Sequence, residues 1–426
     1  MKIRRGGMNF PSIPEIDSQA AWKNALLNIR PDMRSIYIHI PFCRTQCPFC
    51  PFYLQSANES EIDEYVNLLN TELKDHSEYE GIYGELINTV YIGGGTPSDL
   101  TPKQLSKILK TIHKYYKLAN DCEITLEGRI NNFTKEKIIA CIENGINRFS
   151  IGIQTFNTKL RRLIGRLDDT STCINTLNTI SSSNQAAIVI DLLYGIPEQT
   201  IDNWIEDNRI AATEIKISGL DHYQLKLYDN LKLKKIINQN GLKVPDEKEK
   251  FKMYKIGSDL MEEFGATKLS IHHYSFDYRE RNAHNDLATQ RATCIQYGMK
   301  AAGRIAGYFF RNTSKISEYR KYIIAKQKPI SYAGKLTPEF GIASELNYQV
   351  IKKRLLNPYM IGKKDPENYD KILNITLTEI EKWHKRGIVR KSHSGFYKLS
   401  DAALFNYKSY IENLTEKLRK IYTYQK

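Results

Sequence analysis

The sequence lacks any long apolar run. No segment approaches the roughly twenty consecutive apolar residues that a bilayer-spanning helix needs, and the 426 residues contain no internal repeat and no low-complexity linker. The basic residues among positions 1–7 are not followed by an apolar stretch, so we expect no secretory signal. These absences favour a globular protein of the cytoplasm, with no membrane partner.

Blocks of charge of one sign are also missing. The formal net charge is +14, but Lys and Arg are spread along the chain between Asp and Glu. Because there is no basic block and no aromatic–basic module, nucleic acid is not an expected partner. A basic surface of this kind suits an anionic substrate or an acidic electron donor instead.

Cysteine is scarce and odd in number. Four of the seven cysteines are scattered, which suits a reducing cytosol better than a disulfide framework. The scattered ones are Cys122, Cys141, Cys173 and Cys294.

The other three cysteines, Cys43, Cys47 and Cys50, form a C-x3-C-x2-C pattern directly after the apolar run 36–40. Three thiolates on one short loop can ligate three irons of a [4Fe-4S] cluster and leave the fourth iron open. An open iron can chelate the amino and carboxylate groups of S-adenosylmethionine (SAM). The alternative is a zinc loop, but structural zinc normally needs a fourth Cys or His. His39, on the preceding strand, is a poor fourth ligand.

Apolar runs alternate with amphipathic segments between residues 35 and 271. The expected strands are residues 35–39, 89–92, 123–127, 148–151, 188–193 and 220–227. The expected helices are residues 59–76, 101–116, 134–144, 170–181, 200–213 and 248–264. Asn58 with Glu61 is a plausible helix start, and Gly145 a plausible helix stop. Such alternation predicts parallel strands joined by crossover helices.

Polar motifs fall at the ends of successive expected strands. The cysteine loop follows the first strand and the glycines 93–95 follow the second, while Glu127 ends the third. Backbone groups of the glycine run could bind the methionyl end of SAM, because no Cβ blocks close approach; a tight turn is the alternative. Glu127 could bond ribose hydroxyls, or it could be a surface carboxylate paired with Arg129.

Segments 37–43, 93–97, 147–156 and 191–197 resemble radical SAM enzymes of the oxygen-independent coproporphyrinogen dehydrogenase group. That group also contains haem chaperones and anaerobic haem-degrading methyltransferases, and the resemblance covers roughly residues 30 to 310. It implies an α/β fold, a partial (β/α)6 barrel open on one side, with the functional site at the carboxyl ends of the strands.

The resemblance also implies two SAM molecules beside the cluster. Positions that contact the first, cluster-bound SAM correspond to Tyr37, Gly94 and Glu127. Positions that contact the second SAM correspond to Phe49, Gly95, Thr96, Gln154, Arg166 and Asp191. Arg166 could pair bidentately with a SAM carboxylate, although a surface arginine is the alternative.

Departures from the dehydrogenase bear on the substrate. The segments 126–129 and 51–52 differ from its pattern, while 161–169 and 303–308 look like the haem-utilisation branch, which resembles anaerobilin synthases. That branch implies transfer of a SAM-derived methylene to haem, opening of the ring and release of iron, driven by a donor such as flavodoxin, ferredoxin or a reduced flavin. The alternatives are decarboxylation of coproporphyrinogen and a haem chaperone.

Haem would need an axial ligand and cations for its propionates. His272 and His273 follow an expected strand at 268–271, and His222 lies in the sixth strand. Each of these histidines is more often a structural hydrogen bonder than a ligand. The propionate candidates are Arg279, Arg281 and Arg304.

The pattern changes after about residue 310. A helix is expected to open at 336–339, followed by a helix at 377–386 and two short strands at 387–391 and 395–399. This order is typical of a winged helix, for which we favour a lid on the barrel over a DNA-binding role. The expected domains are an N-terminal extension (1–34), the barrel with its extension (35–310) and the C-terminal lid (311–426).

Overall fold

The computed structural model describes residues 12–29, 32–53, 55–79 and 81–422. Residues 1–7, on which the expectation about a secretory signal rests, lie outside these ranges. Among the described residues, no helix combines the length and the apolar character needed to cross a membrane.

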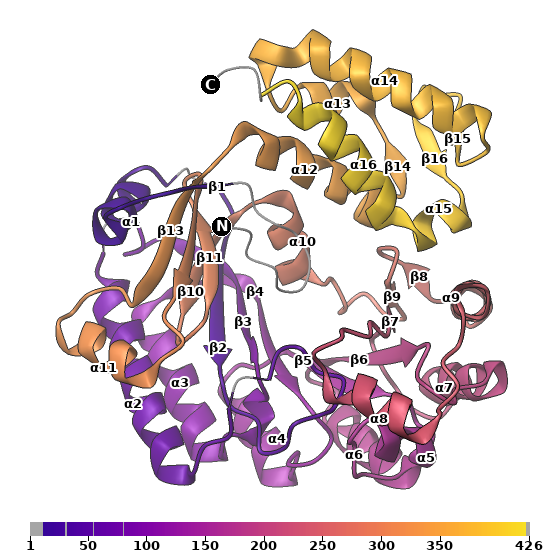
Figure 1. Cartoon of the computed structure of the whole chain (residues 1–426). Coiled ribbons are helices and arrows are strands. Elements are labelled where there is room, and N and C mark those ends of the chain that lie inside the picture. Colours follow the sequence, from indigo (N-terminus) through magenta and orange to yellow (C-terminus); the bar gives the residue numbers. More distant parts are fainter. Residues whose placement is uncertain (1–11, 30–31, 54, 80, 423–426) are drawn as a thin grey trace.

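Six parallel strands, paired in chain order, form the centre of the sheet (Figure 1). They are β2 (Arg34–Ile40), β3 (Leu86–Gly94), β4 (Lys117–Gly128), β5 (Arg148–Gln154), β6 (Ala187–Tyr194) and β7 (Gly219–Gln224). The α/β prediction is confirmed. Within the described residues the outermost strands of the sheet, β1 (Ser12–Pro14) and β8 (Thr267–Lys268), do not pair with each other, so the sheet is open.

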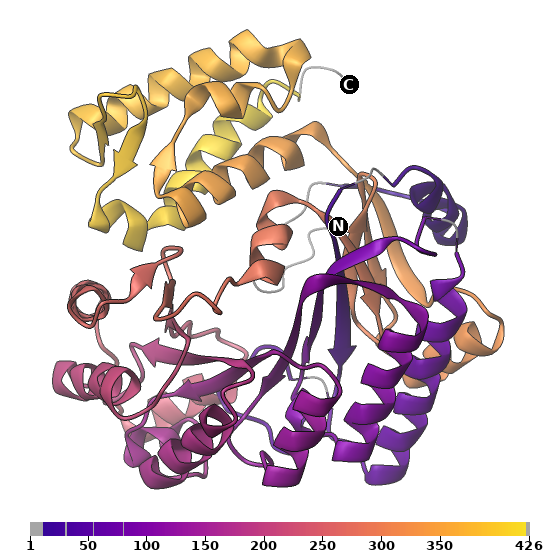
Figure 2. The same cartoon turned by 180° about the vertical axis from the view of Figure 1, so that it is seen from behind.

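Helices cover the outer face of this sheet (Figures 1 and 2). They are α2 (Glu59–Ser77), α3 (Pro102–Tyr115), α4 (Lys135–Glu143), α5 (Thr158–Leu163), α6 (Thr170–Ser182), α7 (Ile201–Thr213), α8 (Lys232–Asn240) and α9 (Glu247–Glu263). The predicted helix start is confirmed, since Asn58 and Glu61 form a reciprocal capping box on α2. Gly145, with φ +94°, follows the end of α4 as expected.

Two strand predictions differ from the structure at the last parallel strand. β7 ends at Gln224 rather than at 227, and the strand predicted at 268–271 is wrong. Residues 269–272 instead form the turn between β8 and β9 (His273–Ser275), where the amides of Leu269 and Ser270 both donate to the His273 carbonyl. The chain reverses its direction at these residues, because β9 pairs antiparallel with β8 in a tight hairpin and also with β7.

An antiparallel extension of the sheet was missed by the sequence analysis. It begins at β10 (Thr293–Tyr297), which pairs parallel with β2 as a seventh parallel strand. The antiparallel strands β11 (Ala302–Ile305), β12 (Tyr308–Asn312) and β13 (Ile330–Leu336) follow, with β1 at the edge and α10 (Ala283–Gln290) and α11 (Ile316–Ile324) in the connections. Helix α1 (Ser18–Leu27) packs on it through Trp22, whose ring lies 5.2 Å from that of Phe310. The sheet therefore continues past the boundary expected at residue 310, and the three-domain division stays a prediction.

The C-terminal region is helical with a small sheet. Its helices are α12 (Pro338–Tyr348), α13 (Pro358–Gly362), α14 (Tyr369–Lys385), α15 (Asp401–Phe405) and α16 (Tyr407–Arg419). Its strands are β14 (Leu355–Leu356), β15 (Val389–Lys391) and β16 (Tyr397–Leu399). The expected helices and hairpin are present, α14 begins earlier than expected, and β14 was not expected. The winged-helix and lid assignments stay predictions.

A buried ion pair ties the antiparallel extension to helix α2. Lys328 and Glu72 are both fully buried, with Nζ and Oε1 2.9 Å apart. Lys328 Nζ also donates to the Gln296 carbonyl at 2.6 Å. Glu72 Oε2 accepts from the Tyr319 hydroxyl at 2.6 Å and from the Gly298 amide at 2.8 Å. Both charges thus have the additional hydrogen bonds that burial requires.

We expect Lys328→Met to lower the free energy of unfolding by about 3–5 kcal/mol, because it leaves the Glu72 carboxylate buried without a cation. Chemical denaturation measures this loss. The matched control is Lys315→Met, whose ion pair with Glu318 is largely exposed and contributes little to stability. Equal losses in the two variants would show that the buried pair has no special role.

Candidate functional site

A cavity of about 490 Å³ opens at the carboxyl ends of the parallel strands. It is lined by all the predicted site residues except Tyr37. These are Cys43, Cys47, Phe49, Cys50, Gly94, Gly95, Thr96, Glu127, Gln154, Arg166 and Asp191. The end of β7 and the segment after it add Tyr223, Lys226 and Tyr228, which the sequence analysis did not single out. The expected convergence of the motifs at one edge of the sheet is therefore observed.

The glycine run holds the cysteine loop rather than offering free amides. The Gly95 amide donates to the Ile40 carbonyl at 2.7 Å, and the Thr96 amide donates to the Phe42 carbonyl at 2.8 Å. A Cβ on Gly95 would lie 2.4 Å from the Phe42 oxygen, so only glycine allows this approach. These amides are engaged within the protein, which leaves backbone carbonyls and side chains for a ligand.

The three thiols are free and have polar neighbours. Cys43 and Cys47 are buried, and Cys50 is half-buried. The Thr96 hydroxyl donates to Cys43 Sγ at 3.3 Å, and Arg129 Nη1 lies 3.8 Å from Cys47 Sγ. Burial raises the pKa of the Cys43 and Cys50 thiols, an effect that bound metal reverses by deprotonating its thiol ligands.

The donor set fits an iron–sulfur cluster better than a single metal ion. Among the described residues, no three His, Cys, Asp or Glu side chains converge as ligands of one ion. A [4Fe-4S] cluster needs no such convergence, because each thiolate binds a different iron. Cys43, Cys47 and Cys50 share one wall of the cavity and would hold the cluster there.

Glu127 is fixed in the interior at the end of β4. It accepts the Tyr91 hydroxyl at 2.6 Å and the Gly94 amide at 3.1 Å, and burial raises the pKa of its carboxyl. The alternative of a surface pair with Arg129 is wrong. Arg129 instead pairs with Asp99 at 3.2 Å and donates to Thr45 Oγ1 at 2.9 Å, which places it beside the cysteine loop.

Gln154 has an unusual backbone conformation. Its φ is +76°, and the β5–β6 register shifts between Gly152 and Gln154, as in a β-bulge. A bulge redirects a side chain, and such strain in a non-glycine residue clusters at functional sites. A Cβ on Gly152 would lie 2.5 Å from Gln154 Nε2, so glycine makes room for this side chain.

Arg166 is a buried cation without a carboxylate partner among the described residues. Its side chain makes no ion pair, its Nε has no hydrogen bond, and its guanidinium lies 5.9 Å from the Phe49 ring centre. Burial lowers the pKa of Arg166. A buried charge is costly unless it is paired, so the position suits an anionic ligand group and not a surface arginine.

Asp191 lies next to a second buried carboxylate. Asp191 of β6 and Asp221 of β7 are register neighbours. Burial, together with the charges of Asp221 and Glu127, raises the pKa of Asp191 to about 7. Two close carboxylates resist ionising together, so the proton is held in this part of the site near neutral pH.

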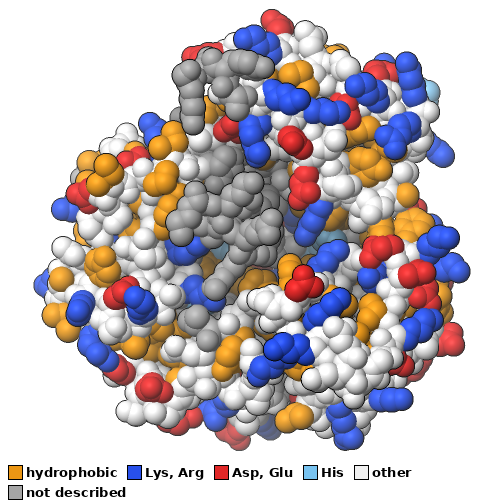
Figure 3. Space-filling view, viewed as in Figure 1, with side chains coloured by type: hydrophobic (Ala, Val, Ile, Leu, Met, Phe, Trp, Pro, Cys, Tyr) orange, Lys and Arg blue, Asp and Glu red, His pale blue; other side chains and the backbone are white. Residues whose placement is uncertain are grey.

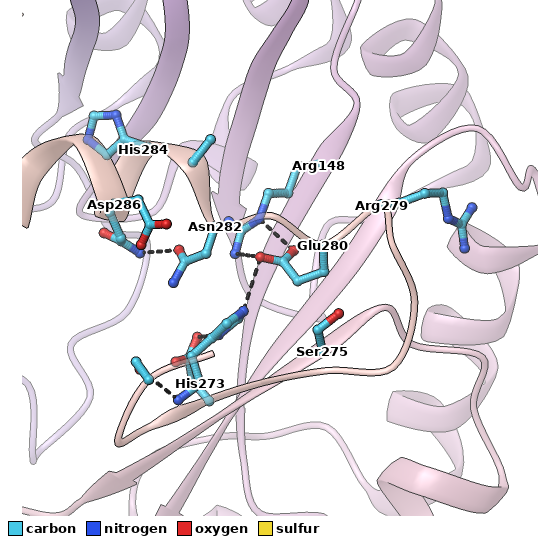
Figure 4. A network of polar contacts seen from close by, with 12 residues as sticks. Arg148, His273, Ser275, Arg279, Glu280, Asn282, His284 and Asp286 are labelled. Carbon is cyan, nitrogen blue, oxygen red and sulfur yellow. Dashed lines mark hydrogen bonds and ion pairs between the residues drawn. The ribbon is translucent and has the colours of Figure 1, made fainter. Parts of the chain in front are cut away.

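Asp221 contacts His273, the first member of a row of alternating charges that continues through Glu280 to Arg148. Figure 4 shows His273, Glu280 and Arg148. His273 Nδ1 lies 3.0 Å from Asp221 Oδ2, and its Nε2 lies 3.1 Å from Glu280 Oε1. Arg148 holds Glu280 through two bonds of 2.8 and 3.1 Å. Burial lowers the pKa of His273, but the two carboxylates outweigh it and raise the value to about 9. Asp221 therefore faces the ring of His273, which lies between two carboxylates.

The three histidines considered as haem ligands differ in whether their ring nitrogens are already engaged. His273 is wrong as a ligand because both ring nitrogens face carboxylates, and His222 is buried with Nε2 2.7 Å from Asn208 Oδ1. His272 keeps a buried Nδ1 without a hydrogen bond, and its ring centre lies 5.6 Å from that of Tyr223 on the cavity wall.

The arginines predicted for propionates do not line the cavity. Arg279 pairs with Asp277, Arg281 pairs with Asp121, and Arg304 donates to the Ala288 carbonyl. Tyr37 is also absent from the cavity wall. Its hydroxyl lies 2.9 Å from His39 Nδ1, and its ring stacks near Tyr91 at 6.3 Å.

Comparisons with known proteins agree with this site. A model of the radical SAM superfamily matches residues 37–209. Anaerobilin synthase of Escherichia coli O157:H7 is 38% identical over 333 residues, which span 77% of this chain and 75% of that protein. The haem chaperone HemW of Bacillus subtilis is 26% identical over 366 residues, which span 86% and 95%. The solved coproporphyrinogen III oxidase HemN of Escherichia coli superposes with a TM-score of 0.80 at 19% identity, covering 96% of each chain.

The fold and the cysteine-lined cavity are those of a radical SAM enzyme. The chain belongs to the group of the radical SAM superfamily that includes anaerobilin synthase and the HemN-like and HemW-like proteins. Membership implies a [4Fe-4S] cluster and SAM as cofactors.

Proposed function

We propose that this protein is a radical SAM methyltransferase that degrades haem without oxygen, opening the ring to a methylated linear tetrapyrrole and releasing iron. The observation that carries the proposal is the placement of Arg166 and Asp191 on the cavity wall, a buried arginine and a partly buried carboxyl group, neither of which makes an ion pair among the described residues. They are the groups expected to hold a second SAM, which a methyl donor requires. The 38% identity to anaerobilin synthase supports the same reading.

When bound, the cluster and SAM would supply the reducing electron and the carbon radical. The protein's own residues bind and orient. Cys43, Cys47 and Cys50 would ligate the cluster, and Glu127 would accept hydroxyls of the first SAM while Tyr91 fixes its carboxylate. The cavity wall keeps water from the reacting carbon, which is the protein's share of the work in cofactor enzymes.

For the second SAM, Arg166 would pair with the carboxylate, and Gln154, redirected by its bulge, would add a hydrogen bond. Asp191 would face a positively charged part of the same molecule. Phe49, whose ring lies beside the Arg166 guanidinium, would cover it from the cysteine loop. Opposite charges at the two ends of the subsite would orient a zwitterionic ligand.

Two other functions have support of their own. Decarboxylation of coproporphyrinogen is supported by the resemblance of the motifs, and the similarity to HemN adds only the fold, at 19% identity. A haem chaperone is supported by the 26% identity to HemW over most of both chains. A chaperone would bind haem and pass it on unchanged, and would not need a methyl donor held beside the cluster.

Anaerobic incubation with haem, SAM and a strong reductant tests the proposal. We expect an open, methylated tetrapyrrole in the mass spectrum, with 5′-deoxyadenosine and free iron. Parallel incubation with coproporphyrinogen should release no carbon dioxide. Haem recovered intact after SAM turnover would refute ring opening, and stoichiometric haem binding without turnover would favour the chaperone.

A further inference from the structure

Two lysines from distant parts of the chain, Lys226 and Lys408, lie near enough for the charge of one to act on the other. Lys226 lines the cavity just beyond β7. A row of rings leads from the same wall to α16, since the Tyr223 ring lies 5.6 Å from His272 and the His272 ring lies 5.8 Å from Tyr407. Lys408 is the next residue of α16, with Nζ 6.0 Å from the Tyr407 ring centre.

Neither lysine has an acidic partner among the described residues. Lys226 Nζ donates to the neutral Gln224 side chain, and Lys408 makes only its contact with the Tyr407 ring. Lys250, the third cation near Lys226, is already paired with Glu247 at 2.8 Å. Figure 3 shows Lys and Arg side chains on both sides of the hollow between the C-terminal helices and the sheet.

The electrostatics of Lys226 agree with a cation-rich mouth. Burial lowers the pKa of Lys226, the charges of Lys408 and Lys250 lower it further, and only Glu247 opposes them. Like charges held together are unfavourable, so an anion that binds between them gains attraction from both. The mouth therefore selects ligands with carboxylates or comparable anionic groups.

We propose that Lys226 and Lys408 form a carboxylate-binding subsite, which takes the two carboxylate side chains of the tetrapyrrole substrate at the mouth of the cavity. This inference rests on the proposed function and specifies how its substrate is held. The aromatic rings of Tyr223 and Tyr228 line the cavity and provide a face for a flat macrocycle beside Lys226. The carboxylate of SAM has a separate candidate partner in Arg166, deeper in the cavity.

A substrate held by both lysines would contact the parallel sheet and the C-terminal helices at once. Lys226 follows the last parallel strand, whereas Lys408 lies in α16. A ligand with two carboxylates on flexible arms can place one on each lysine. Long ammonium side chains suit such mobile anions, because they act as point charges without a fixed fork geometry.

The test compares haem with haem dimethyl ester, in which both carboxylates are blocked. Anaerobic absorbance titration of the wild-type protein should give tighter binding of haem than of the ester. In the double variant K226M/K408M, the haem Kd should rise about tenfold to a hundredfold, as expected for loss of charged hydrogen bonds. The Kd of the ester should stay within about twofold, since it offers no charge to lose.

Lys252→Met is the matched control, because Lys252 is an exposed lysine of α9 outside the cavity wall. This variant should bind haem and the ester with the same Kd values as the wild type. Unchanged haem affinity in K226M/K408M would overturn the subsite while leaving ring opening, measured separately, as evidence for the function. Equal weakening of haem and ester would also overturn it, because the lysines would then act through packing. Failure of the wild type to open haem would overturn the function, and the titration would still decide the subsite.

Discussion

Replacing Cys47 by alanine is expected to abolish the iron–sulfur cluster and with it all cleavage of SAM. The remaining thiolates, Cys43 and Cys50, could hold only two irons, and no third Cys or His among the described residues lines the cavity to replace the lost one. Iron and sulfide content after anaerobic reconstitution should fall to background, and 5′-deoxyadenosine formation should fall by at least about a thousandfold, as for loss of an essential catalytic group.

The matched control is Cys141→Ala, which removes a fully buried thiol of α4 outside the cavity. That variant should reconstitute with a full complement of iron and sulfide, although it creates a small void in the core. A Cys47→Ala protein that loads its cluster fully would show that the cysteine loop is not the cluster site.

Replacing Asp191 by asparagine is expected to remove methyl transfer while leaving the cluster and the cleavage of the first SAM. The change keeps the shape of the side chain and removes a negative charge that sits between Asp221 and Glu127. Because both neighbours are acidic, the variant relieves repulsion and should fold at least as well as the wild type. A loss of methylation of about a hundredfold or more, by mass spectrometry, would then reflect the site and not unfolding.

Binding stoichiometry separates the two SAM molecules in this variant. Equilibrium dialysis should find two SAM molecules per wild-type chain and one per Asp191→Asn chain. Asn203→Asp is a comparison variant that adds a negative charge at the half-buried N3 position of the α7 capping box, outside the cavity wall, where no effect on SAM binding is expected. Two SAM molecules bound to Asp191→Asn, with methylation intact, would show that the second site lies elsewhere.

The same carboxyl predicts a pH dependence. Burial raises the pKa of Asp191, the charges of Asp221 and Glu127 raise it further, and those of Arg148 and His273 oppose them, which gives a value of about 7. Since a raised carboxyl pKa keeps the proton on the folded protein, the carboxylate that would face the second SAM forms only as pH rises through about 7. Methyl transfer in the wild type should rise across this range, and 5′-deoxyadenosine formation should not follow it.

The order and period of the apolar runs were enough to predict the parallel half of the sheet. Strands β2 to β6 and their helices have strong alternation and clear caps, such as the box of Asn58 and Glu61. The antiparallel extension was missed because β11 and β12 are short, and because β1 and β13 pair across a long stretch of sequence, as Ser12 does with Leu336. Local patterns carry no information about such partners.

Most of the predicted site residues line one cavity because several of them lie at or near strand ends. Glu127 and Asp191 project from strand positions that the alternation places. Lys226 and Arg129 were missed as site residues because a lone basic residue has no distinguishing sequence signal, and only the cavity reveals them. The sequence also could not show that His273 lies between two carboxylates, because its partners Asp221 and Glu280 come from separate segments.

Because β1 pairs with β13, the edge of the sheet is formed by residues outside the stretch that carries the motifs. The recognisable motifs end near residue 310. Beyond them, β13 pairs with residues 12–14 at the edge of the sheet, and Lys328 neutralises the buried Glu72. Natural or laboratory recombination that exchanged only the motif-bearing stretch would inherit an unpaired strand and an uncompensated buried acid. An exchanged segment that keeps both of these contacts has to run at least from about residue 12 to the end of β13 at Leu336.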